Sequence, residues 1–409
     1  MTRRVVVTGM AATTSLGDTW ETVADSLRRY RNRVSRNPNW EDYQDLRSRL
    51  ASPILGFETP KEYPRKALRS MGRVALLSTR TTQRALSEAG LQNDPSIKDG
   101  RMGVAYGSSS GSPKALADFT RMLLNKSMRG LTANTYLRMM PHTAPVNIGV
   151  FFGLTGRVIT TCSACTSASQ AIGYAFETIR YGKQKMMIAG GAEELDVSQV
   201  GIFDTLFATS TANDRPDATP RPFDKDRDGL VLGEGAATLI LEDLDHALAR
   251  GATICAELVG FHTNSDGIHI TQPNAQTMEI CLRQALDDAD LAPEQIGYVS
   301  AHGTATERGD IAESVATEAV LGKKAAISSL KSYIGHTLGA CGAIEAWSTI
   351  HMMNHDWYAP TLNLDNLDER CAELDYLVGE GREMQHEFVM SNNFAFGGIN
   401  TSLIFRRWS

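Results

Sequence analysis

The chain has 409 residues, of which 42% are hydrophobic and 22% charged, a composition typical of one large globular domain or two fused ones. Its formal net charge of -6 argues against a general nucleic-acid-binding protein, because phosphate contacts require a basic surface. No apolar stretch is long enough to span a bilayer, and six cysteines over this length do not form a disulfide framework. The N-terminal residues run into a predicted strand and lack the apolar core of a signal peptide, so we expect a cytoplasmic protein.

Strand-like runs alternate with helical patterns along the chain. The first strand is predicted over residues 4–8, followed by a turn at 9–13 and a helix through Trp20, Val23 and Leu27. Further strands are predicted over residues 102–106, 186–189, 236–241, 256–261, 298–301, 325–330 and 401–405. Helices are predicted over residues 76–89, 167–181, 277–289, 310–321 and 340–353. This alternation favours an α/β fold.

Two other segments bear on domain organisation. A charged helical segment over residues 243–250 ends at Gly251 and is predicted to join two halves near residue 252. Residues 29–75 contain many arginines and few long apolar runs, which predicts a surface insertion.

Cys165 lies where a β-branched stretch gives way to a helical pattern. Apolar residues then recur at the spacing of one buried helix face, at Ala168, Ile172, Ala175, Phe176 and Ile179. A thiol in the first turn of a helix is close to unpaired N–H groups, which favour the nucleophilic thiolate. The alternative is a buried cysteine that acts as a small hydrophobe. Cys162 and Cys165 also form a C-x-x-C pair, but no second pair at ligand spacing supports a zinc site.

Three polar segments interrupt apolar strands in the second half of the chain. They cover residues 300–310, 328–340 and 391–400, and each places His, Lys, Thr or Asn beside glycine. Functional sites of α/β proteins lie at such strand ends, where glycine lets the backbone approach a ligand closely. Each segment alone is also compatible with a structural turn.

The set Cys165, His302, Lys331 and His336 resembles the β-ketoacyl-[acyl-carrier-protein] synthases, elongating condensing enzymes of the thiolase-like superfamily. The resemblance covers nearly the whole chain, through residues 4–9, 189–193, 221–229, 233–236 and the three polar segments. It implies a thiolase-like fold, with two similar halves in a five-layered αβαβα arrangement. The N-terminal half would then cover residues 1–252 with the insertion at 29–75, and the C-terminal half residues 253–409.

The resemblance also implies a reaction: decarboxylative Claisen condensation of a Cys165-bound acyl group with malonyl-[acyl-carrier-protein], elongating the chain by two carbons. Backbone N–H groups of Cys165 and Phe396 would form the oxyanion hole for the acyl thioester. His302 and His336 would donate hydrogen bonds to the malonyl enolate. Lys331 would order the two histidines, and Glu345 would anchor Lys331 unless it is a charge on a helix surface.

Further residues match family positions for substrate and partner. The matched pantetheine and acyl contacts are Thr304, Thr306, Phe203 and the gate residue Phe396, with core packing as the alternative for Phe203. Lys66, Arg69, Arg73 and Arg129 are predicted to dock the acidic acyl carrier protein, with a solvated helix face as the alternative. No metal or other cofactor is expected, because the phosphopantetheine of the carrier delivers the acyl group.

Family members pair as dimers, so we expect a homodimer or a heterodimer with a related subunit that lacks the nucleophile. A specialised ketosynthase of a polyketide or aryl-polyene pathway is the alternative to fatty-acid synthesis. It is suggested by Ala395 in place of a usual gate glycine, by Cys162, and by Glu307 in place of a more frequent proline. The chain lacks the second catalytic cysteine of a non-decarboxylating thiolase, since Cys371 lies outside the motif. The intact Cys165 argues against an inactive scaffold.

Overall fold

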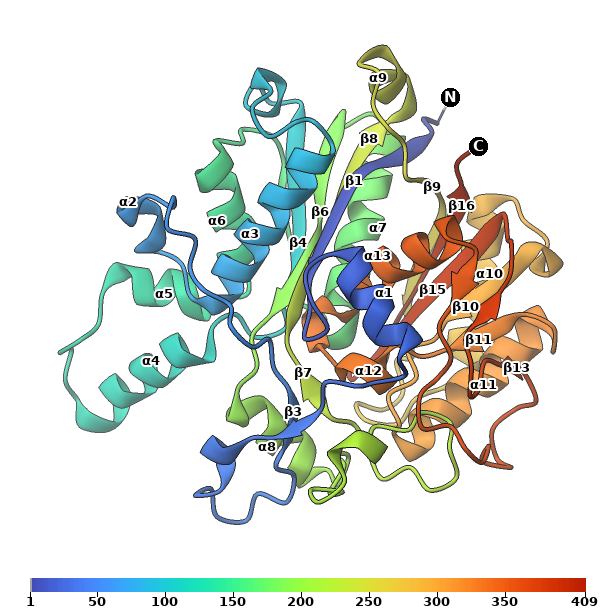
Figure 1. Ribbon diagram of the computed structural model, residues 1–409. Helices are drawn as coiled ribbons and strands as arrows, with labels where there is room; N and C mark the ends of the chain where they lie inside the picture. The colour runs from blue at the N-terminus through green and yellow to red at the C-terminus, as the bar shows by residue number, and fades with distance from the viewer. Residues whose placement is uncertain (1) are drawn as a thin grey trace.

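The computed structural model describes residues 2–409, and its central feature is an 11-stranded sheet to which two halves contribute (Figure 1). The first half provides β1 (Val5–Thr13), β4 (Met102–Gly107), β5 (Val158–Thr161), β6 (Met186–Glu193) and β8 (Gly235–Asp243). The second half provides β9 (Ala256–Ser265), β10 (Ile296–Ser300), β11 (Ala326–Ser328), β15 (Phe388–Ala395), β16 (Ile399–Arg407) and the edge strand β13 (Asp375–Tyr376). All eight predicted strands overlap observed ones.

The two halves repeat one topology. The strand order is β5-β4-β6-β8-β1 in the first half and β11-β10-β15-β16-β9 in the second. Numbered within its own half, each order reads third, second, fourth, fifth, first. In both halves the second strand is parallel to the third and fourth, and the fifth is antiparallel to both neighbours. Residues 5–7 of β1 pair with residues 256–258 of β9 and join the halves, which confirms the predicted thiolase-like fold.

Helices form the other three layers. Helices α7 (Ser167–Arg180) and α13 (Cys341–Asn354) lie between the two halves of the sheet system. Helices α3 (Arg73–Glu88) and α6 (Thr143–Phe152) cover the outer face of the first half, and α10 (Ala275–Ala289) and α11 (Glu307–Leu321) that of the second. The remaining helices are α1 (Trp20–Arg28), α2 (Arg65–Leu68), α4 (Pro113–Asn125), α5 (Ala133–Met139), α8 (Val197–Thr205), α9 (Leu244–Ala249) and α12 (Lys331–Ile334). Within residues 2–409, none of the helices is long and apolar enough to cross a bilayer.

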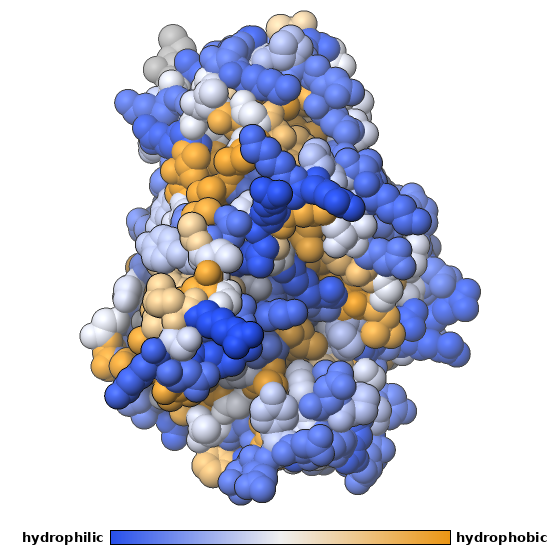
Figure 2. Space-filling model, turned by 90° about the vertical axis from the view of Figure 1, so that its left-hand side faces the viewer, coloured by the Kyte–Doolittle hydropathy of each residue, from blue (hydrophilic) through white to orange (hydrophobic). Residues whose placement is uncertain are grey.

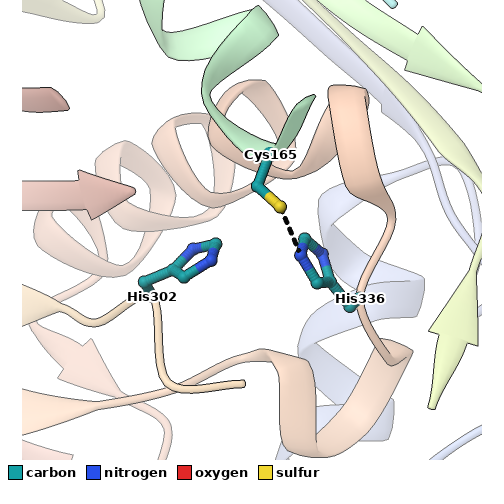
Figure 3. A group of neighbouring side chains, drawn as sticks. All are labelled: Cys165, His302 and His336. Atoms are coloured by element: carbon teal, nitrogen blue, oxygen red, sulfur yellow. Dashed lines mark hydrogen bonds between the residues drawn. The ribbon is translucent and has the colours of Figure 1, made fainter. Parts of the chain in front are cut away.

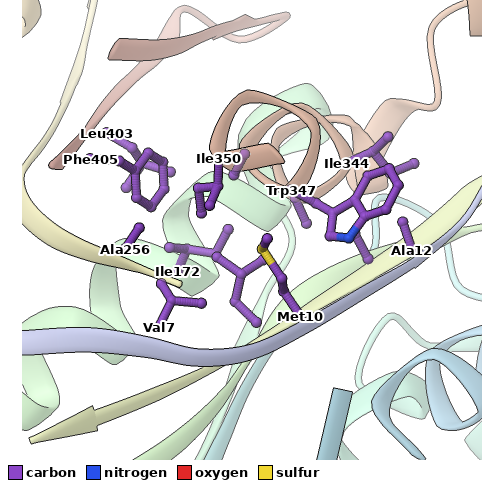
Figure 4. Close-up of a cluster of buried hydrophobic side chains, with 14 of the residues drawn as sticks. Val7, Met10, Ala12, Ile172, Ala256, Ile344, Trp347, Ile350, Leu403 and Phe405 are labelled. Carbon is purple, nitrogen blue, oxygen red and sulfur yellow. The ribbon is translucent and has the colours of Figure 1, made fainter. Parts of the chain in front are cut away.

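Apolar cores fill the spaces between these layers. Alternate residues of one strand face different cores: Met186 and Ile188 of β6 face the outer core, whereas Met187 and Ala189 face the central one. The central core packs side chains of both halves against the two middle helices, as Figure 4 shows for Val7, Met10, Ala12, Ile172, Ala256, Ile344, Trp347, Ile350, Leu403 and Phe405. The predicted apolar face of α7 is buried in this core, which fixes the helix that follows Cys165.

Two sequence-based predictions about the first half are wrong. The predicted turn at residues 9–13 continues β1, because these residues pair with β8 after a register shift between Val7 and Gly9. Gly9 is needed where α3 crosses the strand, since a Cβ there would lie 2.5 Å from the carbonyl oxygen of Ala85.

The predicted surface insertion at residues 29–75 also contributes to the interior. It holds β2 (Ser35–Arg36) and β3 (Leu50–Ser52), and β3 pairs with β7 (Leu232–Gly233) far along the chain. Leu50 and Ala51 are fully buried by that pairing, which a search for long apolar runs does not detect. The other small sheet is formed by β12 (Trp357–Tyr358) and β14 (Arg382–Glu383).

Candidate active site

Cys165 lies in a single 3₁₀ turn, Ala164–Thr166, between the end of β5 and the start of α7. The preceding Ala164 has a φ of 50°, a left-handed conformation that few residues other than glycine adopt. The hydroxyl of Ser167 closes the turn by accepting a hydrogen bond from the backbone N–H of Ser163 at 2.9 Å. The prediction of a strand-to-helix junction at Cys165 is therefore confirmed. Cys165 is 3% exposed and lines a cavity.

Burial changes the expected ionisation of this thiol. It raises the pKa of Cys165 to about 11, against the opposing effects of the Lys331 charge and the backbone N–H groups of Phe396 and Cys165. The prediction that the helix start favours a resting thiolate is therefore wrong, because desolvation outweighs the nearby dipoles. The same two N–H groups lie close to the sulfur, which is the region in which the carbonyl oxygen of an acyl group on Cys165 would lie.

His336 is in direct contact with the thiol. Its Nε2 atom lies 3.0 Å from Sγ of Cys165, and its Nδ1 atom accepts a hydrogen bond from the backbone N–H of Leu338 at 3.1 Å. Because Nδ1 is an acceptor, the proton of the neutral ring is on Nε2. His336 therefore presents a hydrogen-bond donor to the sulfur.

His302 approaches the same space from the other side, and Figure 3 shows both rings directed toward the sulfur. Its backbone N–H and that of Gly303 donate to the two carboxylate oxygens of Glu313, each at 2.7 Å. Its Nδ1 atom faces two donors, Nζ of Lys331 at 3.2 Å and Nδ2 of Asn393 at 3.3 Å. The proton of this ring is therefore also on Nε2.

A buried ion pair lies behind the histidines. Nζ of Lys331 contacts Oε1 of Glu345, and both side chains are 1% exposed. Burial lowers the pKa of Lys331, but the effects of Glu345, Cys341 and Glu313 together outweigh it, so the net effect is a raised pKa and a retained charge. Glu345 is not a helix-surface charge, and it contacts Lys331 as the family resemblance implied.

A cavity of about 570 Å³ leads from the surface to Cys165. Its lining includes His302, His336, Thr304, Thr306 and Phe396, and the two threonine hydroxyls are hydrogen bonded to each other at 2.9 Å. Phe203 does not belong to this lining. Its ring packs against that of Phe396 with centroids 5.2 Å apart, so its contact with the cavity is indirect.

The ligand atoms of Cys165, His302 and His336 lie within 4.8 Å of one another, a donor set that zinc accepts elsewhere. Metal coordination requires a free lone pair on the nitrogen that faces the sulfur. Here donors on both Nδ1 atoms place protons on both Nε2 atoms. The arrangement is therefore suited to hydrogen-bond donation.

Comparisons with known proteins show the family of the chain. Residues 2–247 match the family described as Beta-ketoacyl synthase, N-terminal domain, and residues 255–365 match its C-terminal domain. The chain belongs to the beta-ketoacyl synthase family. It is 37% identical to "3-oxoacyl-[acyl-carrier-protein] synthase 2" of Synechocystis sp., over 99% of this chain and 98% of that protein.

Solved structures of the beta-ketoacyl synthase family extend the comparison. A beta-ketoacyl synthase from Burkholderia phymatum STM815 is 58% identical, with a TM-score of 0.98 and full coverage of both chains. The ishigamide ketosynthase/chain length factor is 29% identical, with a TM-score of 0.91 and full coverage of both chains. This chain therefore has the backbone of a ketosynthase from end to end.

The predicted gate segment, residues 394–398, lines the cavity and is held by a backbone contact. Gly397 and Gly398 have φ angles of 89° and 69°, whereas Ala395 ends β15, paired with Ile399. The N–H of Gly397 donates to the carbonyl oxygen of Ile270 at 2.8 Å. Ala395 is absent from the residues with positive φ, so its methyl group causes no backbone strain in this structure.

The predicted docking residues do not lie on one helix. Lys66 is on α2 and Arg69 follows it, both exposed, while Arg129 is exposed after α4. Arg73 begins α3, and its guanidinium makes two contacts of 2.7 Å with the buried carboxylate of Glu234. Arg73 must therefore be removed from the docking set, because its charge is already neutralised.

Three neighbours of the site were not predicted to take part in it. Glu313 holds the His302 loop, Asn393 contacts the ring of His302, and Cys341 donates from Sγ to the carbonyl oxygen of Cys165 at 3.2 Å. The spacing of Asp310 and Glu313 on α11, two carboxylates on one buried face, was a usable signal. Asn393 was inside a motif already singled out, whereas nothing in the sequence around Cys341 indicated its contact.

The buried histidines predict a pH-dependent stability. Burial and the Lys331 charge lower the pKa of His302 and of His336 well below 6.5. In the unfolded chain each imidazole binds a proton below about pH 6.5. The unfolded state then binds more protons than the folded state, so the free energy of unfolding falls as the pH is lowered below about 6.5, by up to about 1.4 kcal/mol per pH unit for each histidine.

Urea unfolding of the native chain and of His336→Gln, from about pH 7.5 to 5, measures this contribution. The variant lacks one of the two groups, so its free energy of unfolding is expected to decrease less steeply than that of the native chain. Above about pH 6.5 the two curves run parallel. Parallel curves below that pH would contradict the prediction.

Proposed function

We propose that this chain is a 3-oxoacyl-[acyl-carrier-protein] synthase, which condenses a Cys165-bound acyl group with malonyl-[acyl-carrier-protein] and releases CO₂. One observation carries the proposal: a buried thiol faces two imidazoles that both present Nε2–H donors. A histidine serving as a general base would need a lone pair there. Two donors instead suit a reaction in which negative charge develops on an oxygen beside the thiol.

In the first step, Cys165 takes the acyl group from the phosphopantetheine thiol of the carrier. The sulfur attacks the thioester carbonyl, and the thiol proton of Cys165 moves to the departing pantetheine sulfur. The oxyanion of the tetrahedral intermediate accepts hydrogen bonds from the backbone N–H groups of Cys165 and Phe396. The raised pKa of Cys165 keeps the resting thiol protonated, and the donor from His336 stabilises negative charge on the sulfur as it attacks.

In the second step, malonyl-carrier protein enters, and the bond between its carboxylate carbon and the methylene carbon breaks. The electron pair forms an enolate whose oxygen accepts from Nε2–H of His302 and of His336. The enolate carbon attacks the Cys165 thioester, and collapse of the intermediate returns a cysteine thiolate, which takes a proton from solvent. Lys331 holds its charge behind Nδ1 of His302 and favours the enolate electrostatically. No metal or redox cofactor enters this proposal.

The decisive experiment follows the release of labelled CO₂ from carboxyl-labelled malonyl-carrier protein in the presence of an acyl-carrier primer. A synthase releases CO₂ and forms a 3-oxoacyl product. A non-decarboxylating thiolase would exchange acyl groups and release no CO₂. Failure to release CO₂ with any primer, even with a related partner subunit added, would reject the proposed function.

Carrier docking is proposed at Lys66, Arg69 and Arg129, which are exposed and make no ion pair with any other residue of the described chain, 2–409. Lys66→Glu with Arg69→Glu is expected to raise the KM for acyl-carrier protein about tenfold or more, since each reversal replaces attraction by repulsion of an acidic partner. The exposed Lys324, reversed to Glu, is the matched control. Reaction with a small acyl-pantetheine thioester should not change, and equal losses with both substrates would contradict docking there.

A paired assembly is also part of the proposal, either with a second copy or with a related subunit lacking the nucleophile. Strand β5 is the unpaired edge of the first half, and Val158 on it is 51% exposed. Figure 2 shows the side of the molecule that carries α2 to α6, where apolar surface lies between hydrophilic patches. Exposed apolar residues there include Leu123, Leu124, Met128 and Val150. Likeness to the ishigamide ketosynthase/chain length factor supports the pair with a related subunit. The sequence departures at Ala395, Cys162 and Glu307, which suggest a specialised pathway, support the same pair.

A further inference from the structure

Asn393 connects the ion pair of the site with its histidine. Its side chain is fully buried on β15, directly behind His302. Its Nδ2 atom donates to Oε2 of Glu345 at 2.6 Å and lies 3.3 Å from Nδ1 of His302. The other carboxylate oxygen of Glu345 is taken by Lys331, so three polar groups converge behind one imidazole.

The orientation of the Asn393 amide follows from its neighbours. A carboxylate accepts hydrogen bonds, so the amide must turn its NH₂ group to Glu345. The carbonyl oxygen Oδ1 then points to Gly342 and has no hydrogen-bond partner among residues 2–409. It would lie 2.5 Å from a Cβ at position 342. An acceptor left without a partner in the interior costs free energy, typically about 1–3 kcal/mol. The NH₂ group of Asn393 therefore makes the hydrogen bonds that matter at this position, whereas its carbonyl oxygen makes none.

We propose that Asn393 is a positioning residue for the condensation step: it ties Glu345 to Nδ1 of His302 and so holds the ring with Nε2–H directed into the reaction space. The inference rests on the proposed synthase function. Lys331 alone is a long, rotatable point charge, which fixes the ring plane poorly. The planar amide of Asn393 is fixed at one hydrogen by Glu345. It directs its second hydrogen toward Nδ1 of His302 at 3.3 Å, and Sγ of Cys341 is a more distant acceptor at 3.7 Å.

The two half-reactions separate this role from a merely structural one. Acyl transfer to Cys165 depends on the oxyanion N–H groups and on His336, neither of which Asn393 contacts. Malonyl decarboxylation depends on the donor from His302. Loss of the Asn393 amide is therefore expected to slow decarboxylation about 10- to 100-fold, the range found when a group that orients a functional histidine is removed. Acyl transfer should stay within about threefold of native, since its own contacts remain.

The experiment compares Asn393→Leu and Asn393→Ala with the native chain, measuring acyl-enzyme formation and malonyl decarboxylation separately. Asn392→Leu is the matched control. It replaces the neighbouring buried asparagine of β15, whose amide atoms make no hydrogen bond within the described chain and whose side chain faces away from that of Asn393. The control should keep the native ratio of the two rates. Equal loss of both rates in the Asn393 variants, or a native ratio, would overturn the inference.

Nitrogen-15 NMR of labelled histidine gives a second readout that needs no substrate. In the native chain the two ring nitrogens of His302, assigned by comparison with His302→Gln, should give well-separated shifts, one protonated and one not. In Asn393→Leu those shifts are expected to move toward each other as the ring samples both tautomers. Unchanged shifts would overturn the inference. Shifts that are separated in the native chain and converge in Asn393→Leu, in a chain that releases no CO₂, would reject the proposed function and leave the positioning role standing.

Discussion

Cys165→Ala is expected to lower condensation by a factor on the order of 10⁴ or more, because the acyl group then has no sulfur to which it can be transferred. Release of CO₂ from malonyl-carrier protein is expected to continue, within about tenfold of the native rate, since both Nε2–H donors remain. The measurements are the mass of the acylated chain and the yield of labelled CO₂. The expected result is an unmodified chain that still decarboxylates and forms no 3-oxoacyl product.

Two other thiols provide the control for this result. Cys162 is exposed and donates to the carbonyl oxygen of Ser109 at 3.4 Å, while Cys341 is buried against the backbone of Cys165. Cys162→Ala should condense at the native rate. An acyl adduct on the Cys165→Ala chain would contradict the assignment and show that another residue accepts the acyl group. Loss of CO₂ release together with condensation would mean that the histidines need the sulfur in place.

The sequence predicted those parts of the structure that are determined locally. Apolar runs located the strands, which are buried on both faces, and the helical pattern located the helix after Cys165, which buries one face. The residues that surround the thiol were found through family motifs, since their separations along the chain carry no information on distance. His302 and His336 are more than a hundred residues from Cys165, and only the assembled fold brings the three side chains to one cavity.

The errors share a physical cause, which is that burial depends on the assembled layers. The pKa of Cys165 was expected to be low from its helix start, but the cavity around it was not visible in the sequence. Arg73 was counted as a surface cation, yet Glu234, from a distant strand connection, neutralises it. Glu345 was ambiguous for the same reason: its helix has little amphipathic contrast because it lies between two sheets and is buried all round.

Removing Lys331 is expected to destabilise the fold strongly. Lys331→Met leaves the Glu345 carboxylate buried with one remaining donor, Asn393, and such an uncompensated charge typically costs about 3–5 kcal/mol. Urea unfolding at neutral pH measures the loss. The exposed pair of Lys323 and Glu373, with side chains 60% and 80% exposed, is the matched control, and Lys323→Met should cost less than about 1 kcal/mol. Equal effects of the two variants would show that the interior pair is not charged.

A double variant separates the effect of this ion pair on the stability of the fold from its effect on the reaction. Lys331→Met with Glu345→Leu removes both charges, and apolar replacement of a complete buried pair is often neutral or stabilising. The double variant should therefore recover most of the free energy of unfolding lost by Lys331→Met alone. Its condensation rate should stay at least about 100-fold below native, since no cation supports the enolate through Nδ1 of His302. Recovery of stability and activity together would assign the pair a purely structural role. Recovery of stability alone would mean that this buried charge is retained for the reaction, at a position where the fold itself does not require it.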